Sequence, residues 1–85
     1  MNAPYKASHA IGSAVRVVQS AVLEHFQQSW KLHNPLITEQ LAFAGLEATV
    51  KSIGYYHGGD VLYVLWDVPG VWHEQCLETE AAVNA

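Results

Sequence analysis

The order of apolar and polar residues changes character once along the chain, near Ser20. Before this point, the run AVRVV at 14–18 follows Gly12 and contains three valines. Their β-branched side chains favour extended backbone, so the pattern predicts a first strand within residues 10–19. The alternative is a single helix over about 8–31, which the same valines disfavour.

After Ser20, apolar residues recur at the spacing of a helix. They share one face of the predicted helix: Val22, Leu23, Phe26 and Trp30. Ser20 is the expected N-cap, because its side-chain oxygen can accept a bond from the first turn. We expect the helix to end near His33, because Asn34 precedes Pro35 and the α region is disfavoured before proline. Docking on the sheet or on another subunit is expected for Leu23, Phe26 and Trp30.

A second short helix is predicted over 38–44. Thr38 or Asn34 is the candidate cap, and Gly45 is suited to end the helix. Residues 20–45 therefore form a predicted helical insertion between the first strand and the rest of the chain.

The second half has the pattern of strands. In the segment EATVKSIGYY at 47–56, the apolar residues switch faces halfway: Ala48 and Val50 against Ile53 and Tyr55. A bulge near Ser52 would reconcile the two halves. A hairpin turn is predicted at 57–60.

The next strand, VLYVLWDV at 61–68, is apolar on both faces. One face, together with Ile53, is predicted as core: Leu62, Val64 and Trp66. The other is predicted to contact a second copy of the chain: Val61, Tyr63 and Leu65. The alternative is that the helical insertion folds back and covers this face within one chain. A strand that is apolar on both faces needs a cover on each side, which predicts a homo-oligomer, most simply a dimer.

The sequence VPGV at 68–71 predicts a type II turn with proline and glycine at its centre. A short strand, one helical turn and a last strand near Leu77 follow, so that the strands after the insertion occupy 46–78. The two ends are expected to be loose: 1–9 as an arm and 79–85 as a frayed tail.

Composition narrows the class of protein. The 85 residues suffice for one domain, and a net charge of −4 with four Lys and Arg argues against nucleic acid binding. No apolar run has the length of a membrane span, and the first residues lack a signal-peptide pattern. A single cysteine, Cys76, excludes an internal disulfide and predicts a cytoplasmic protein.

This order of elements resembles the Src-homology-3-like barrel. The predicted fold is mainly β within the α+β class: a five-stranded barrel with a one- or two-helix insertion after the first strand. In length and style the chain is also similar to the short proteins carried on mobile gene cassettes.

Two families share short motifs with the chain. GSAVR, SIGYY and CLE resemble motifs of the plasmid-borne type II dihydrofolate reductases. VRV, LYVLWD and WHEQCLE are similar to the barrel of the nitrile hydratase β subunit. The second resemblance implies an accessory subunit without catalytic residues, because that family holds its metal in the other subunit.

The reductase resemblance does not extend to function. That family lines its pore with a lysine after the first Val-Arg and with a Gln-Ile-Tyr triplet. The matching positions here hold other residues: Val17, Gly70, Val71 and Trp72. Folate reduction is therefore not expected.

Candidate metal ligands lie close together in the sequence near its end. His73 and Cys76 have the spacing His-x-x-Cys, with Glu74 between them. Another ligand would come from His57, or from one of the helix histidines, His25 and His33. No paired motif frames them, and no basic neighbour activates Cys76 as a nucleophile. We expect no metal, no cofactor and no catalytic residue.

The aromatic residues are a stronger lead. The candidate ligand-binding residues come from neighbouring strands: Tyr55, Tyr56, Tyr63, Trp72 and His73. Such side chains can line a groove for a peptide or a flat small molecule. The alternative is that the larger rings fill the core and the tyrosines lie at its rim.

Three hypotheses for function follow. The first is a small, non-catalytic binding module that self-associates. The alternatives are an accessory subunit of an enzyme, and a small-molecule enzyme whose site forms between subunits.

Overall fold

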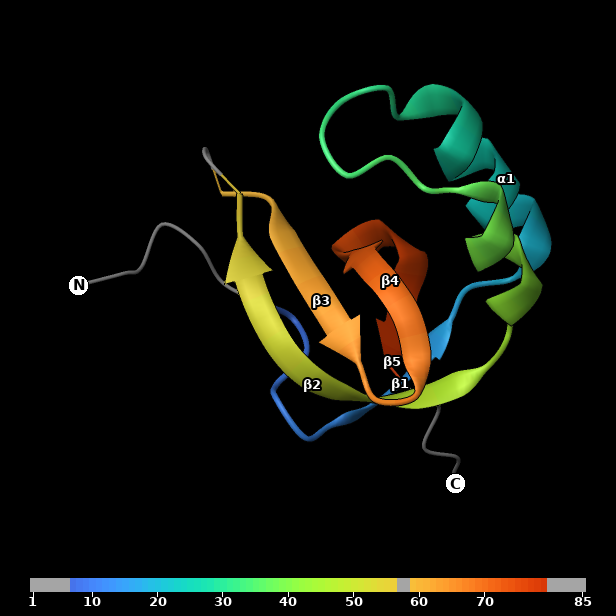
Figure 1. Ribbon diagram of the computed structural model, residues 1–85. Helices are drawn as coiled ribbons and strands as arrows, with labels where there is room; N and C mark the ends of the chain where they lie inside the picture. The colour runs from blue at the N-terminus through green and yellow to red at the C-terminus, as the bar shows by residue number, and fades with distance from the viewer. Residues whose placement is uncertain (1–6, 57–58, 80–85) are drawn as a thin grey trace.

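The structure is a computed structural model that describes residues 7–56 and 59–79. Its elements follow in this order: β1 (Ala14–Val17), α1 (Ser20–Ser29), η1 (Thr38–Phe43), β2 (Glu47–Tyr55), β3 (Val61–Leu65), β4 (Val68–His73), η2 (Glu74–Cys76) and β5 (Leu77–Thr79). The strands form one antiparallel sheet in the order β4-β3-β2-β1-β5 (Figure 1). The chain is therefore mainly β within the α+β class.

The described sheet is open, because its edge strands β4 and β5 do not pair with each other. Most of the predicted arm (1–9) and tail (79–85) lies outside the described residues, as does the middle of the predicted turn at 57–60. Within 7–56 and 59–79, no helix has the length and apolar content needed to cross a bilayer.

β2 holds the two halves of the sheet together. Residues 47–49 pair with β1, and residues 50–55 pair with β3. The register shifts between Val50 and Ser52, where an extra residue bends the strand. The bulge predicted near Ser52 is therefore confirmed, and the bend curves the sheet around the core (Figure 1).

The core face of β3 is the opposite of the predicted one. The three residues predicted to meet a second copy are instead buried within the chain: Val61, Tyr63 and Leu65. Leu62 and Val64, predicted as core, are half-buried, and Trp66 is 53% exposed. Both the core assignment of Trp66 and the exposed patch on β3 are wrong.

The cross-strand partners explain this difference. Ile53 of β2 and Trp72 of β4 both lie directly opposite Tyr63, and directly opposed residues share a face of the sheet. Ile53, correctly predicted to pack on the core, therefore brings Tyr63 inward with it. Because both faces of β3 are apolar, its own alternation could not decide which face is buried.

A two-residue turn at Trp66 and Asp67 joins β3 to β4. Leu65 pairs with Val68 across this turn, and Asp67 has a φ of 63°, a left-handed conformation that aspartate tolerates better than most residues. The type II turn predicted at 68–71 is wrong, because these residues already belong to β4.

Pro69 and Gly70 form a bulge within β4, since Val64 pairs beyond them with Val71. Proline has no N–H to donate, and Gly70 has a φ of 103°, so both residues suit a bulge. Gln40 of η1 donates from Nε2 to the Val71 carbonyl at 3.1 Å. A Cβ on Gly70 would lie 2.8 Å from this Nε2, so glycine lets η1 approach the edge of β4.

The helical insertion adds apolar side chains to the core. Leu23 and Phe26 of α1 are buried, and Trp30 packs against the same core. Their predicted docking is confirmed, and it supplies the packing that so short a helix needs. Val22, predicted on the same face, is 48% exposed.

The ends of the helices differ slightly from the predicted ones. Gln19 is the N-cap of α1 in place of Ser20, and the helix ends at Ser29, with Trp30 as its C-cap, before His33. η1 is a 3-10 helix whose N-cap is Ile37, with a backbone N–H that donates to Oε1 of Gln40 at 3.0 Å. Neither Thr38 nor Asn34 is therefore its N-cap. Gly45, with a φ of 79°, follows its C-terminal end as predicted.

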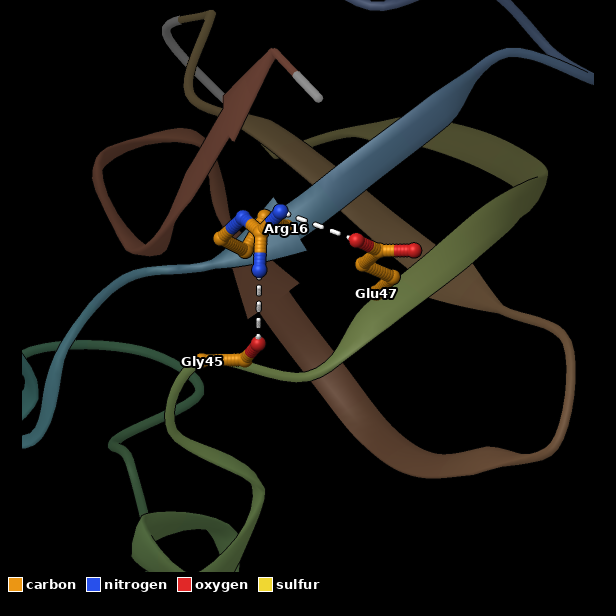
Figure 2. Close-up of polar contacts among 3 residues, drawn as sticks. All are labelled: Arg16, Gly45 and Glu47. Carbon is orange, nitrogen blue, oxygen red and sulfur yellow. Dashed lines mark hydrogen bonds and ion pairs between the residues drawn. The ribbon is translucent and has the colours of Figure 1, made fainter. Parts of the chain in front are cut away.

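Arg16 joins the two ends of the insertion (Figure 2). Its Nη1 donates to the Gly45 carbonyl at 3.2 Å, and its Nη2 donates to Oε2 of Glu47 at 2.9 Å. Beside it, Val17 N–H donates to Leu46 O and Gly45 N–H donates to Val17 O. The insertion therefore leaves and re-enters the sheet at one place.

Two tryptophans provide a matched test of this core. Trp72 is fully buried, whereas the Trp66 ring lies at the surface, 4.7 Å from Nζ of Lys51. We expect Trp72→Ala to lower the free energy of unfolding by about 3–5 kcal/mol and Trp66→Ala to lower it by less than about 1 kcal/mol. Urea denaturation measures both, and a larger loss in Trp66→Ala would contradict the described register.

Candidate ligand-binding site

Five rings gather where the loop after α1 meets the ends of β2 and β4; we term them the ring cluster. They come from three parts of the chain: Phe26, Trp30 and His33 from α1 and its loop, Tyr56 from the end of β2, and His73 from the end of β4. In Figure 1 the loop after α1 arches over the side of the sheet that carries β4 and η2.

The backbone conformation at Asn34 and two hydrogen bonds to loop carbonyls determine the path of this loop. Asn34 has a φ of 49°, a left-handed conformation that asparagine tolerates better than most residues. Trp30 Nε1 donates to the His33 carbonyl at 2.7 Å, and Gln27 Nε2 donates to the Leu36 carbonyl at 3.2 Å. The loop is thereby tied back to α1 while His33 reaches the sheet.

His33 joins the loop to the β2–β3 connection. Its ring stacks on Tyr56, with centroids 3.5 Å apart and planes 6° from parallel. Its Nε2 lies 3.2 Å from Oδ2 of Asp60 but is buried and makes no hydrogen bond. The distance suits an ion pair, whereas the orientation does not suit a hydrogen bond. Tyr56 N–H donates to Asp60 O at 2.9 Å, which keeps Asp60 beside the stacked rings.

His73 forms the buried side of the ring cluster, with only 1% of the residue exposed. Its ring centroid lies 4.9 Å from that of Trp30 and 5.0 Å from that of Phe26. Its Nε2 lies 2.8 Å from the Asn34 carbonyl. A carbonyl only accepts, so the bond requires that Nε2 carries the hydrogen and donates it.

Burial lowers the pKa of His73 below its ordinary value of 6.5, because a charged imidazolium is disfavoured away from water. The bond to the Asn34 carbonyl opposes this shift. Protonation of the neighbouring His33 would lower the pKa of His73 further, whereas the charge of Asp60 raises it.

An open depression of about 290 Å³ lies beside the ring cluster. Its lining comes from the start of β3 and from η2: Gly59, Asp60, Val61, Glu74 and Gln75. Asp60 connects the two features, because it lines the depression and its Oδ2 lies 3.2 Å from Nε2 of His33. Among the described residues, the lining carries two carboxylates and no lysine or arginine.

The residues predicted to bind a ligand are divided between surface and core. Tyr56 and His73 both lie in the ring cluster, and His33 contacts each of them. Tyr55 is 47% exposed at the end of β2. Tyr63 and Trp72 are fully buried and lie opposite each other on β3 and β4. These two rings fill the core and present no surface to a ligand.

The hydroxyl of Tyr63 is influenced by Glu74, which lines the depression. The hydroxyl oxygen accepts a hydrogen bond from the backbone N–H of His9 at 3.3 Å. Burial raises the pKa of Tyr63, and the charge of Glu74 raises it further, while the bond from His9 opposes both. The phenol is therefore protonated at neutral pH.

Sequence reasoning missed Phe26, Trp30 and Asp60 as members of the site and treated His33 only as a candidate metal ligand. The pattern places Phe26 and Trp30 in helix packing, and Asp60 in a turn. The pairing of His33 with Tyr56 and Asp60 joins segments more than twenty residues apart in the sequence. The sequence signal that could have indicated this pairing is Asn34-Pro35, because the α region is disfavoured before proline and the chain turns there.

The other candidates from the sequence are a metal site and a nucleophilic cysteine. Among residues 7–56 and 59–79, no three His, Cys, Asp or Glu side chains come together to hold a metal ion; His57 lies outside the described residues. Cys76 is buried, and burial raises the pKa of its thiol to about 12. A thiol in this state is a poor nucleophile at neutral pH.

No protein-family model, curated protein or solved structure matches the chain.

The lowered pKa of His73 makes stability depend on pH. The folded protein binds a proton at His73 less tightly than the unfolded chain does. The contribution of neutral His73 to the free energy of unfolding is therefore fully present above pH 6.5. It is lost as the pH falls below 6.5 toward the pKa of His73 in the folded protein. We expect the free energy of unfolding to fall over this range, and to fall less steeply in His73→Gln.

The exposed His25 of α1 provides the control for this experiment. Urea denaturation at a series of pH values compares the slopes, so that any uniform loss of stability in a variant does not affect the result. His25→Gln should keep the slope of the wild type. An unchanged slope in His73→Gln would rule out His73 as its source.

Proposed function

We propose that the chain is a small, non-catalytic binding module that takes a peptide or a small molecule at the depression beside the ring cluster. The observation that carries the proposal is the stack of His33 on Tyr56 with Asp60 beside it. Tyr56 is 39% exposed, and Asp60 lines the depression. A partly exposed ring next to a few polar groups in a concave surface is the usual composition of a binding site.

The topology supports the proposal that the fold is an Src-homology-3-like barrel. β2 is bent and shared between both halves of the sheet, and the long insertion lies between β1 and β2. A single 3-10 turn, η2, precedes the last strand. The ring cluster and the depression draw on the insertion, the β2–β3 connection and η2, so three connections of the proposed barrel would meet at the site.

The chemistry of the site favours binding over catalysis. Cys76 is a buried thiol, and His73 is only 1% exposed, so its ring nitrogens do not face solvent. A general base needs a free basic nitrogen within reach of the substrate. The exposed groups, Tyr56 and Asp60, are suited to contact a ligand. The single cysteine also supports a cytoplasmic location as part of this proposal.

Binding can be tested without knowledge of the natural ligand. A mixture of short random-sequence peptides is titrated into the ¹⁵N-labelled protein, and amide shifts are followed by NMR. We expect the shifts to concentrate at Tyr56, Asp60 and Gln75. Tyr56→Ala should weaken them by about tenfold, as expected when an aromatic contact is removed.

Trp66→Ala is the matched control, since it removes an exposed ring at the β3–β4 turn. It should leave the shifts at the site unchanged. Shifts that concentrate around Trp66, or their absence from the depression, would contradict the proposed site.

Self-association, as a dimer, is the second part of the proposal. The face of β3 no longer supports it, but three apolar side chains of the insertion are exposed: Val22 at 48%, Leu32 at 66% and Ile37 at 52%. Exposed apolar groups of this size often mark a contact between identical chains.

Analytical ultracentrifugation tests this part at micromolar protein concentration. We expect the wild type to sediment as a dimer of the 9.4 kDa chain and Leu32→Lys to sediment as a monomer. Lys51→Glu, an exposed change on β2, should keep the dimer. A wild-type species of 9.4 kDa would contradict self-association.

A further inference from the structure

We infer that residues 31–35, in the loop after α1, form a pH-sensitive latch: protonation of His73 lifts them off the sheet while the rest of the fold stays intact. The latch is a property of the fold, so its opening can be measured whether or not the depression binds a ligand. Opening would also take the His33 ring off Tyr56, a consequence for binding that rests on the proposed function.

Side chains, and not backbone pairing, hold this loop to the sheet. Within the described part of the chain, residues 31–35 make no backbone–backbone hydrogen bond. Their contacts with the sheet use histidine rings. Nε2 of His73 donates to the Asn34 carbonyl at 2.8 Å, and the His33 ring stacks on Tyr56. A segment without backbone bonds opens at a lower free energy than the strands it covers.

The ends of the loop confine the movement. The loop begins directly after the C-cap of α1. At its other end, Leu36 is buried, and Nε2 of Gln27 donates to its carbonyl at 3.2 Å. Of residues 31–35, only His33 is not exposed. Opening therefore costs few apolar contacts and leaves both α1 and Leu36 in place.

The two histidines differ in what faces them. Oδ2 of Asp60 lies 3.2 Å from Nε2 of His33, so a charge on His33 is paired there. His73 packs against Phe26 and Trp30 and is only 1% exposed. Its ring centroid lies 5.6 Å from that of His33. A charge on His73 is therefore removed from water and is repelled by a charge on His33.

The other titratable groups near His73 do not reverse this difference. Glu74, the next residue along the chain, lines the depression, and Lys31 is exposed at the start of the loop. Burial is the largest cause of the lowered pKa of His73, and the opposing charge of Asp60 has a smaller effect. The closed loop therefore favours the neutral imidazole.

Opening the loop removes the obstacle to protonation. It takes the Asn34 carbonyl and the His33 ring away from His73, so that water reaches the imidazole and its pKa returns toward the ordinary value of 6.5. Below pH 6.5 the open form consequently binds the proton more tightly than the closed form. For one titrating group, the open population rises by up to about tenfold per pH unit. The rise ends at the pKa of His73 in the closed form.

The three tryptophans report on this opening independently. Nε1 of Trp30 donates to the His33 carbonyl at 2.7 Å, and opening breaks this bond. Nε1 of Trp72 is buried, so its hydrogen exchanges only when the core opens. Trp66 is exposed. NMR measures the hydrogen exchange of each indole from about pH 7.5 to about pH 5. Division by the Trp66 rate removes the intrinsic effect of pH on exchange.

We expect the normalised exchange of Trp30 to rise as the pH falls below 6.5, by up to about tenfold per pH unit. It should exceed that of Trp72 by at least about tenfold throughout. His73→Gln keeps an N–H for the Asn34 carbonyl but takes no charge in this range, so its Trp30 exchange should not rise. His25→Gln, an exposed change on α1, should behave as the wild type does.

Several results would overturn the latch. Equal normalised exchange of Trp30 and Trp72 would show that only global unfolding exposes His73. A rise that persists in His73→Gln, or no rise in the wild type, would exclude His73 as the sensor. The wild type also provides a test without a variant, because the rise must level off at the pH where the His73 ring signals titrate. None of these results decides whether peptides bind at the depression, which the random-peptide titration tests separately.

Discussion

The bend in β2 at Val50 and Ser52 is the feature on which the other contacts depend. One strand must pair with β1 along its first part and with β3 along its second, and only a bulge lets it do both while the sheet curves around a single core. The extra residue also exchanges the two faces of the strand. Ile53 consequently faces inward, as do Tyr63, which lies opposite it, and Trp72, which lies opposite Tyr63. The exposed position of Trp66, in the turn directly after β3, follows from the same parity.

A curved sheet of this size leaves one side uncovered, and the insertion covers it. A small domain has little interior of its own, so apolar groups added from outside the sheet contribute much of its core. Leu23 and Phe26 supply them from α1, and the contacts of Arg16 and Gly45 fix the point where the insertion starts and ends. The exposed pair of Arg16 with Glu47 adds little free energy by itself. Phe26 also packs on His73, so the insertion forms part of the core and part of the candidate site.

Local pattern predicted most of the elements, and failed where a choice depended on distant partners. The helical spacing located α1, and the switch of parity located the bulge in β2. The faces of β3 could not be assigned from alternation, because both are apolar. After β3, Pro69-Gly70 was the stronger local signal for a turn, yet the pairing of Leu65 with Val68 places the turn at Trp66 and Asp67. Of the candidate site, Tyr56 and His73 were predicted, whereas Asp60 and the role of His33 depend on where the loop after α1 crosses the sheet.

His73 connects the stability of the fold with the geometry of the site. A buried histidine is a costly choice for a core position, because burial lowers its pKa and makes stability depend on pH. A leucine would fill a similar volume but would leave the Asn34 carbonyl without its donor at 2.8 Å. That bond fixes the residue next to His33, and the position of His33 determines the stack on Tyr56 and the approach to Asp60. The polar group in the core is therefore best explained by the surface that it positions, since local departures from an apolar core are expected at functional sites.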